Sequence, residues 1–223
     1  MMWKSIVYKE WLKIRWFFVG YTLLGILGIG YLFLTVKHSF AFNGGKNTWN
    51  IVLFLGHQFF SPLKYVPLAG GLTIAIAQYF PETVNKRIKL TFHLPLGENK
   101  ILLMMHAFGS ISLLLSFLIF FGLFTGFSLI YFPVQMVADS LISIFPWFLA
   151  GFSAYFLVAL IVLEPAWKFR LFYSLVGGFF LTIYYTSAVT AAYGPANTGL
   201  FVLTAFLSIA LLFSAHRFRK GEM

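Results

Sequence analysis

Long apolar runs separated by short polar stretches form the pattern of hydrophobic and polar positions along this chain. Six of these runs approach the ~20 residues that a helix needs to cross the hydrocarbon core of a membrane. They cover about residues 17–36, 59–80, 101–131, 140–163, 171–191 and 199–215. We therefore expect an all-α, polytopic membrane protein with six transmembrane helices, built as a single domain over residues 1–223.

The segment before the first run, residues 3–16, has the spacing of an amphipathic helix. Its apolar residues recur at intervals of three and four and so share one helical face: Trp3, Val7, Trp11 and Ile14. Such a helix lies in the membrane plane with its lysines toward the lipid headgroups, although residues 3–16 could instead simply extend the first span. Glu10 lies near the edge of the apolar face, where an unpaired carboxylate is costly, so we expect a cationic partner nearby.

Composition excludes a soluble domain and several kinds of chemistry. Hydrophobic residues make up 60% of the chain and charged residues only 10%, whereas soluble domains average about 25% charged residues. Polar groups therefore cannot cover the surface, and lipid is the expected solvent. The chain has no cysteine, which excludes disulfides, thiolate metal sites and cysteine nucleophiles.

The net charge of +10 is unevenly distributed over the predicted topology. Thirteen of the 16 lysines and arginines fall on one side, and the other side holds only Lys37, Lys46 and Lys64. Cytoplasmic loops of membrane proteins are enriched in Lys and Arg, so we expect both termini and the polar insert 81–100 in the cytoplasm. The charge then sets topology, and no nucleic-acid partner is expected. Residues 49–60 are apolar but too short to span, and we expect them at the opposite interface.

The insert between the second and third runs has the pattern of a short cytoplasmic helix. Pro81 and Glu82 suit a first helical turn. Three apolar residues then recur at four-residue steps and form one stripe, with basic residues off it: Val84, Ile88 and Phe92 against Lys86, Arg87 and Lys89. Pro95 and Gly97 end the element, and Glu98 opens the third span. The alternative is an ordinary solvated connector.

Taken together, these features resemble the ABC-2 type permeases, the membrane subunits of ATP-binding-cassette exporters. The likeness lies in the entry segment "KEWLKIRWFF", the six spans, the cytoplasmic termini and the insert, in which Glu82 is followed thirteen residues later by Pro95-Leu96. In this family the insert is a coupling helix that docks on a separate ATPase subunit. The resemblance assigns that role to these residues: Glu82, Lys86, Arg87, Lys89, His93 and Pro95.

The resemblance also implies partners and a location. ATP and Mg would bind in the cytoplasmic ATPase subunit, so this chain would hold no cofactor and would not itself be an enzyme. A second permease copy or paralogue and membrane lipid would be the other partners. The complex would lie in the cytoplasmic (inner) membrane of a prokaryote and export a substrate that the sequence does not identify.

Small residues follow one another at four-residue steps in the fifth run, and such stripes let membrane helices approach closely. They are Gly178, Thr182, Thr186 and Thr190. Packing within the chain explains the stripe, but the resemblance also allows it to face a second subunit or the transport pathway. Gln78, Tyr184 and Tyr185 are further candidates for a pathway lining.

Two other functions compete with transport. Ser153 in "GFSAY" raises the possibility of an intramembrane serine protease of the rhomboid type. A histidine on the sixth span would then act as the base. His216 lies about nine residues from the middle of that span, which is ~13 Å in depth, whereas a serine–histidine pair needs ~3 Å. We therefore expect Ser153 to be a small packing residue. A non-catalytic scaffold or channel is the third possibility. No set of His, Asp and Glu residues at metal-ligand spacing occurs in any predicted span, so no metal site is expected.

Overall fold

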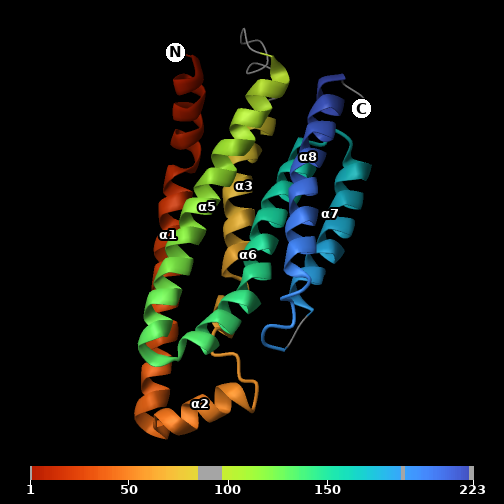
Figure 1. The fold of residues 1–223 in the computed structure, drawn as a ribbon. Coiled ribbons are helices and arrows are strands. Elements are labelled where there is room, and N and C mark those ends of the chain that lie inside the picture. The colour runs from red at the N-terminus through yellow and green to blue at the C-terminus, as the bar shows by residue number, and fades with distance from the viewer. Residues whose placement is uncertain (1, 85–96, 187–188, 221–223) are drawn as a thin grey trace.

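The computed structural model describes residues 2–84, 97–186 and 189–220, and all the regular structure in these ranges is helical. The long helices form a bundle (Figure 1), and both chain ends lie at the same end of it. In chain order the elements are α1 (Met2–Asn43), α2 (Gly45–Leu53), η1 (Ser61–Leu63), α3 (Val66–Thr83), α5 (Glu98–Tyr131), α6 (Val134–Leu163), α7 (Trp167–Thr182), η3 (Ile183–Tyr185) and α8 (Asn197–Lys220). The all-α prediction is confirmed.

Helix α1 is a single helix of 42 residues, so the separate interfacial helix predicted over residues 3–16 is wrong. No proline or capping residue interrupts the chain near residue 16, and the helical hydrogen bonds therefore continue into the first apolar run. Ile14 is fully buried, which shows that this part of α1 packs on the protein rather than lying flat in a membrane plane. The alternative prediction, in which residues 3–16 extend the first span, agrees with the single helix α1.

Helix α6 is the centre of the bundle. Its main neighbours are α3, α5, α7 and α8, while α1 packs on α3 and α5. The closest approach is between α3 and α6, where a Cβ on Gly71 would lie 2.0 Å from the carbonyl oxygen of Gly151. Since only glycine tolerates such backbone contact, this pair fixes the seam between the two helices.

Three described helices are long and apolar enough to cross a membrane, over Lys4–Asn43, Lys100–Tyr131 and Val134–Leu163. Large apolar side chains cover much of the outer surface of the bundle, among them Leu24, Leu27 and Phe179. Contact between water and so large an exposed apolar surface would be unfavourable. The fold therefore indicates a membrane-embedded protein.

The remaining helices depart from the predicted runs at their ends. Helix α3 starts at Val66 rather than near residue 59, because Pro62 lies in the η1 turn and Pro67 occupies the first helical turn. It continues through Pro81 to Thr83, so the prediction that Pro81 and Glu82 open the insert helix is wrong. A proline this close to a helix end removes only one hydrogen bond.

Helix α7 ends at Thr182, well short of the predicted residue 191. The hydroxyl of Tyr193 accepts a hydrogen bond from the Thr186 backbone N–H at 3.1 Å and donates to the Ile183 carbonyl. These contacts take the place of helical hydrogen bonds. The chain then turns through Ala191, whose φ of 59° lies in the left-handed region.

Helix α2 lies across the bundle at the end opposite the two termini (Figure 1). It has nine residues, which is too few to span a membrane. Trp49 joins it to the bundle by donating from its indole nitrogen to the Tyr131 carbonyl at 3.0 Å. The segment 49–60, for which an interfacial position was predicted, overlaps α2 only over residues 49–53.

Candidate functional site: a buried polar network

Four charged side chains meet between the first turns of α1 and the last turn of α3. The Lys13 Nζ atom lies 2.5 Å from Glu10 Oε1 and 2.5 Å from Glu82 Oε1, and Lys9 Nζ lies 2.8 Å from the same Glu82 oxygen. Both carboxylates are buried, with residue exposures of 0% for Glu10 and 2% for Glu82. Lys13 is the cationic partner expected for Glu10. The two positive and two negative charges of these described residues balance, and their contacts tie α1 to α3.

The charged state of Glu82 is set by these two lysines. Glu82 lies beyond the predicted span 59–80. Lys13 and Lys9 both place a positive charge within hydrogen-bond distance of this buried carboxylate, which favours its ionised form. Lys13 contacts both buried carboxylates, so its removal would leave a buried charge without its ion-pair partner.

Gln78, one turn before Glu82 on α3, extends the cluster to two more helices. Its amide nitrogen donates to Glu10 Oε2 at 3.0 Å and to the Met105 carbonyl of α5 at 2.6 Å. Its amide oxygen accepts from the Tyr155 hydroxyl of α6 at 2.7 Å. Gln78 is fully buried, and it joins α1, α3, α5 and α6 at one point.

The network ends in an aromatic group between α3, α5 and α6. The Tyr79 hydroxyl lies 3.3 Å from the Tyr155 hydroxyl and 3.4 Å from His106 Nδ1. The His106 ring packs against Tyr155 and Phe156. Its other nitrogen, Nε2, is buried and has no hydrogen-bond partner among the described residues. A continuous polar path thus runs from the charged cluster into the centre of the bundle.

The polar groups of this network are used in contacts between helices. Among the described residues, no three His, Cys, Asp or Glu side chains gather as metal ligands would. The carboxylates of Glu10 and Glu82 are held in ion pairs. The network is a set of short, buried contacts that join α1, α3, α5 and α6.

Ser153 belongs to a second, smaller polar cluster. Its hydroxyl donates to the Tyr184 hydroxyl at 2.8 Å and lies 3.2 Å from Thr204 Oγ1, and the Tyr184 and Thr204 hydroxyls are 2.8 Å apart. These partners are hydroxyls from η3 and α8, not an imidazole. Ser153 is buried where α6, η3 and α8 meet, as a packing residue would be.

Only one of the predicted coupling residues has a described position. Glu82 is buried against α1, not exposed to a docking partner. The other five lie outside the described residues: Lys86, Arg87, Lys89, His93 and Pro95. The chain leaves α3 and enters α5 at the same end of the bundle as the two termini (Figure 1).

The candidates for a pathway or subunit face do not form one surface. Gln78 is buried inside the bundle, whereas Gly178 and Thr182 are exposed on α7. Thr186 and Thr190 follow the end of α7, so the predicted four-residue stripe does not run along one continuous helix. Tyr185 is half-buried and its ring faces that of Tyr65 at 5.5 Å.

Several residues that complete the network were not predicted from the sequence. Tyr79, Tyr155 and His106 gave no local signal, and Lys9 and Lys13 were assigned to lipid headgroups. A usable signal was present on α3, where Gln78 and Glu82 lie one turn apart in a largely apolar helix. Polar residues at such positions mark internal contacts or functional sites in membrane proteins.

Comparison with known proteins adds no relative to these observations: no family model, curated protein or solved structure matches the chain. The class that the fold defines is a membrane-embedded helical protein. Any finer assignment depends on the residues and contacts described above.

Proposed function

We propose that this chain is the membrane subunit of an ATP-binding-cassette exporter of the ABC-2 type, with α1, α3, α5, α6, α7 and α8 as its six spans. A separate cytoplasmic ATPase would supply the energy, and a second permease copy or paralogue would complete the transporter. The observation that carries the proposal is the position of Glu82. This residue lies at the end of α3, just before the predicted coupling insert, and is locked to α1 by two lysines.

The ion pairs of Glu82 would allow a movement of the insert to reach the helices of the bundle. Movement at the insert would displace the end of α3, and the Glu82 ion pairs would pass that displacement to α1. Gln78, one turn further along α3, would pass it to α5 and α6 through its contacts with Met105 and Tyr155. A coupling element needs rigid, discrete contacts of this kind, because loose apolar packing would absorb the movement.

The distribution of charge supports the cytoplasmic placement of this end. Lys4, Lys9, Lys13 and Arg15 lie in the first turns of α1, and α5 and α7 each begin beside basic residues, Lys100 and Lys168. Among the described residues, the opposite end with helix α2 carries only Lys37, Lys46 and Lys64. An excess of basic residues is typical of the cytoplasmic side.

The proposal is tested by ATPase activity that co-purifies with the tagged full-length chain from its native membranes. We expect Mg-dependent ATPase activity with the wild type and its loss with the double variant Lys86→Glu and Arg87→Glu. The matched control is Lys37→Glu with Lys46→Glu, which reverses two lysines at the other end and should keep the activity. Since the chain has no cysteine, single introduced cysteines can verify that every variant keeps its topology.

Equal ATPase recovery from both double variants would refute the coupling role. Absence of any co-purifying ATPase from native membranes would favour the scaffold or channel instead. The protease alternative predicts a different result: Ser153→Ala would abolish a proteolytic activity. The hydroxyl partners of Ser153 argue against that result.

A further inference from the structure

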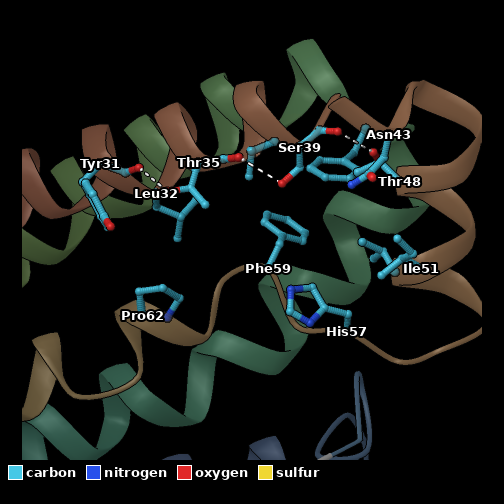
Figure 2. Close-up of a pocket in the computed structure, with 13 residues that line it drawn as sticks. Tyr31, Leu32, Thr35, Ser39, Asn43, Thr48, Ile51, His57, Phe59 and Pro62 are labelled. Atoms are coloured by element: carbon cyan, nitrogen blue, oxygen red, sulfur yellow. Dashed lines mark hydrogen bonds between the residues drawn. The ribbon is translucent and has the colours of Figure 1, made fainter. Parts of the chain in front are cut away.

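A cavity of about 420 Å³ lies at the end of the bundle opposite the ion-pair cluster. The last turns of α1 form one side, and α2 with the segment around residues 57–62 forms the other. Figure 2 shows Thr35 and Ser39 along the α1 side, with His57, Phe59 and Pro62 across from them. Cavities of about 300–1,000 Å³ are the usual size of small-molecule sites.

The polar lining of this cavity includes three hydroxyls whose protons are already used, together with Tyr31, Asn43 and His57. Thr35 Oγ1 donates to the Tyr31 carbonyl at 3.1 Å, and Ser39 Oγ donates to the Thr35 carbonyl at 3.1 Å. Thr48 Oγ1 donates to the Gly44 carbonyl at 3.0 Å and shares its proton with the Ser39 carbonyl at 3.3 Å. A hydroxyl has one proton and two lone pairs. These three groups therefore offer only acceptors, and a matching ligand must bring O–H or N–H donors.

Apolar side chains form most of the rest of the lining. Leu32, Val36 and Phe132 are buried core residues that reach the cavity, and Phe59 packs between them and the bundle. The Phe59 ring stacks on Phe132 with centroids 4.4 Å apart. This wall would take the apolar body of a ligand, not a second polar group.

The charge around the cavity does not favour an ionic head. Among the described residues, no Asp or Glu lines it, so a cation would find no counter-ion. No Lys or Arg lines it among these residues either, so an anion would meet only the uncharged donors of groups such as Asn43 beside the acceptors of Thr35 and Ser39. Lys37 and Lys46, which follow and precede the lining residues on α1 and α2, are exposed and do not line the cavity.

We propose that this cavity binds a neutral amphiphile with a hydroxylated head, such as a monoacylglycerol. The head would donate to Thr35, Ser39 and Thr48, and the start of the acyl chain would lie against Leu32 and Val36. The position at the ends of the long helices, beside the transverse helix α2, corresponds to the depth where a lipid changes from polar head to apolar chain. The site is independent of the proposed ATPase coupling.

The test uses the full-length protein in phosphatidylcholine nanodiscs and a monoacylglycerol that carries a photoreactive diazirine near its head. We expect crosslinks concentrated in residues 31–62. Unlabelled decanoylglycerol should compete, while decyltrimethylammonium and decyl sulfate, which have a similar chain length and a charged head, should not. The double variant Thr35→Val and Ser39→Ala removes two acceptors and should weaken labelling about tenfold, because each hydrogen bond contributes about 0.5–1.5 kcal/mol.

Ser174→Ala is the matched control, because the Ser174 hydroxyl on α7 also donates to a carbonyl within its own helix and is exposed away from the cavity. It should leave labelling unchanged. Circular dichroism and size-exclusion profiles equal to wild type will show that the double variant is folded; if it is not, Ser39→Ala alone is used and should weaken labelling severalfold. Labelling that spreads evenly over the lipid-facing helices, or that the charged amphiphiles displace equally well, would overturn the proposal. So would labelling that the acceptor variants leave unchanged.

Discussion

Helices α3 and α7 are both short, with 18 and 16 residues, yet they occupy opposite environments. Helix α3 packs on α1, α5 and α6 and buries Gln78 and Glu82. Helix α7 packs mainly on α6 and η3, and its outer face exposes Leu175 and Phe179, at 68% and 77%. The helix with buried polar groups is inside, and the helix with an exposed apolar face is outside.

Soluble proteins bury apolar side chains and expose polar ones. The reverse arrangement of α3 and α7 is expected for a protein surrounded by lipid. Polar groups in hydrocarbon must find partners within the protein, whereas an apolar face has no reason to be buried. Helix α3 therefore gains its position from specific polar contacts and from close backbone approach. Helix α7 remains free to meet lipid or another subunit. Changes to the two helices should have very different effects.

The largest effect is expected from Lys13→Met, which removes the cation between Glu10 of α1 and Glu82 of α3. Glu10 would then lose its ion pair with Lys13 and keep the hydrogen bond from Gln78, while Glu82 would keep its ion pair with Lys9. Breaking a buried pair costs about 3–5 kcal/mol. The free energy of unfolding, measured by denaturant titration in detergent, should fall by that amount.

Lys9→Met is the control, because its side chain is 41% exposed and Glu82 keeps its ion pair with Lys13, so we expect a smaller loss than for Lys13→Met. A double variant, Lys13→Met with Glu10→Gln, should recover part of the loss because it removes the carboxylate that Lys13 had paired. Equal effects of the two lysine variants would mean that the cluster does not hold α1 on α3.

The next effect is expected from Gly71→Ala at the seam of α3 and α6. The new Cβ would lie 2.0 Å from the Gly151 carbonyl oxygen, and neither backbone can move without separating the helices. Overpacking costs about 1–3 kcal/mol or more, which thermal unfolding would detect. Gly28→Ala on α1 is the control, since a Cβ there would have nothing within 4 Å. A stable Gly71→Ala protein would show that the seam is looser than described.

A smaller loss is expected from Gln78→Leu, which keeps a side chain in place but removes its hydrogen bonds. Glu10 loses a donor and the Tyr155 hydroxyl loses an acceptor, which should cost on the order of 1–2 kcal/mol. Ser174→Ala on α7 removes one exposed hydroxyl and should stay within about 0.5 kcal/mol of wild type. If the two variants were equally stable, the network would be incidental to the packing of α3.

The sequence predicted the all-α fold of this bundle correctly, because long apolar runs indicate helices. It predicted their ends poorly. The end of α7 depends on Tyr193, which folds back on Ile183 and Thr186, and no periodicity could reveal that contact. The separate interfacial helix was wrong for a related reason: an amphipathic pattern cannot distinguish burial against lipid headgroups from burial against α3 and α5.

The polar network was predictable only in part. The position of Glu10 and the high cost of burying its charge correctly indicated a cationic partner. Gln78 was identified as unusual but was assigned to a pathway, because its partners Met105 and Tyr155 lie 27 and 77 residues away in sequence. Contacts of this range become visible only when the helices are placed together.

The smallest effect on the chain itself is expected from Gly178→Ala on the outer face of α7. Nothing lies within 4 Å of a Cβ there, and replacing glycine by alanine in an exposed helix stabilises it by up to about 1 kcal/mol. Unfolding of the monomer in detergent should therefore shift slightly upward. If this face also contacts a second permease subunit, as the proposed transporter allows, the added methyl should weaken dimer crosslinking in membranes while the monomer stays intact. A destabilised monomer would instead mean that α7 packs within its own chain, and the contrast between α3 and α7 would fail.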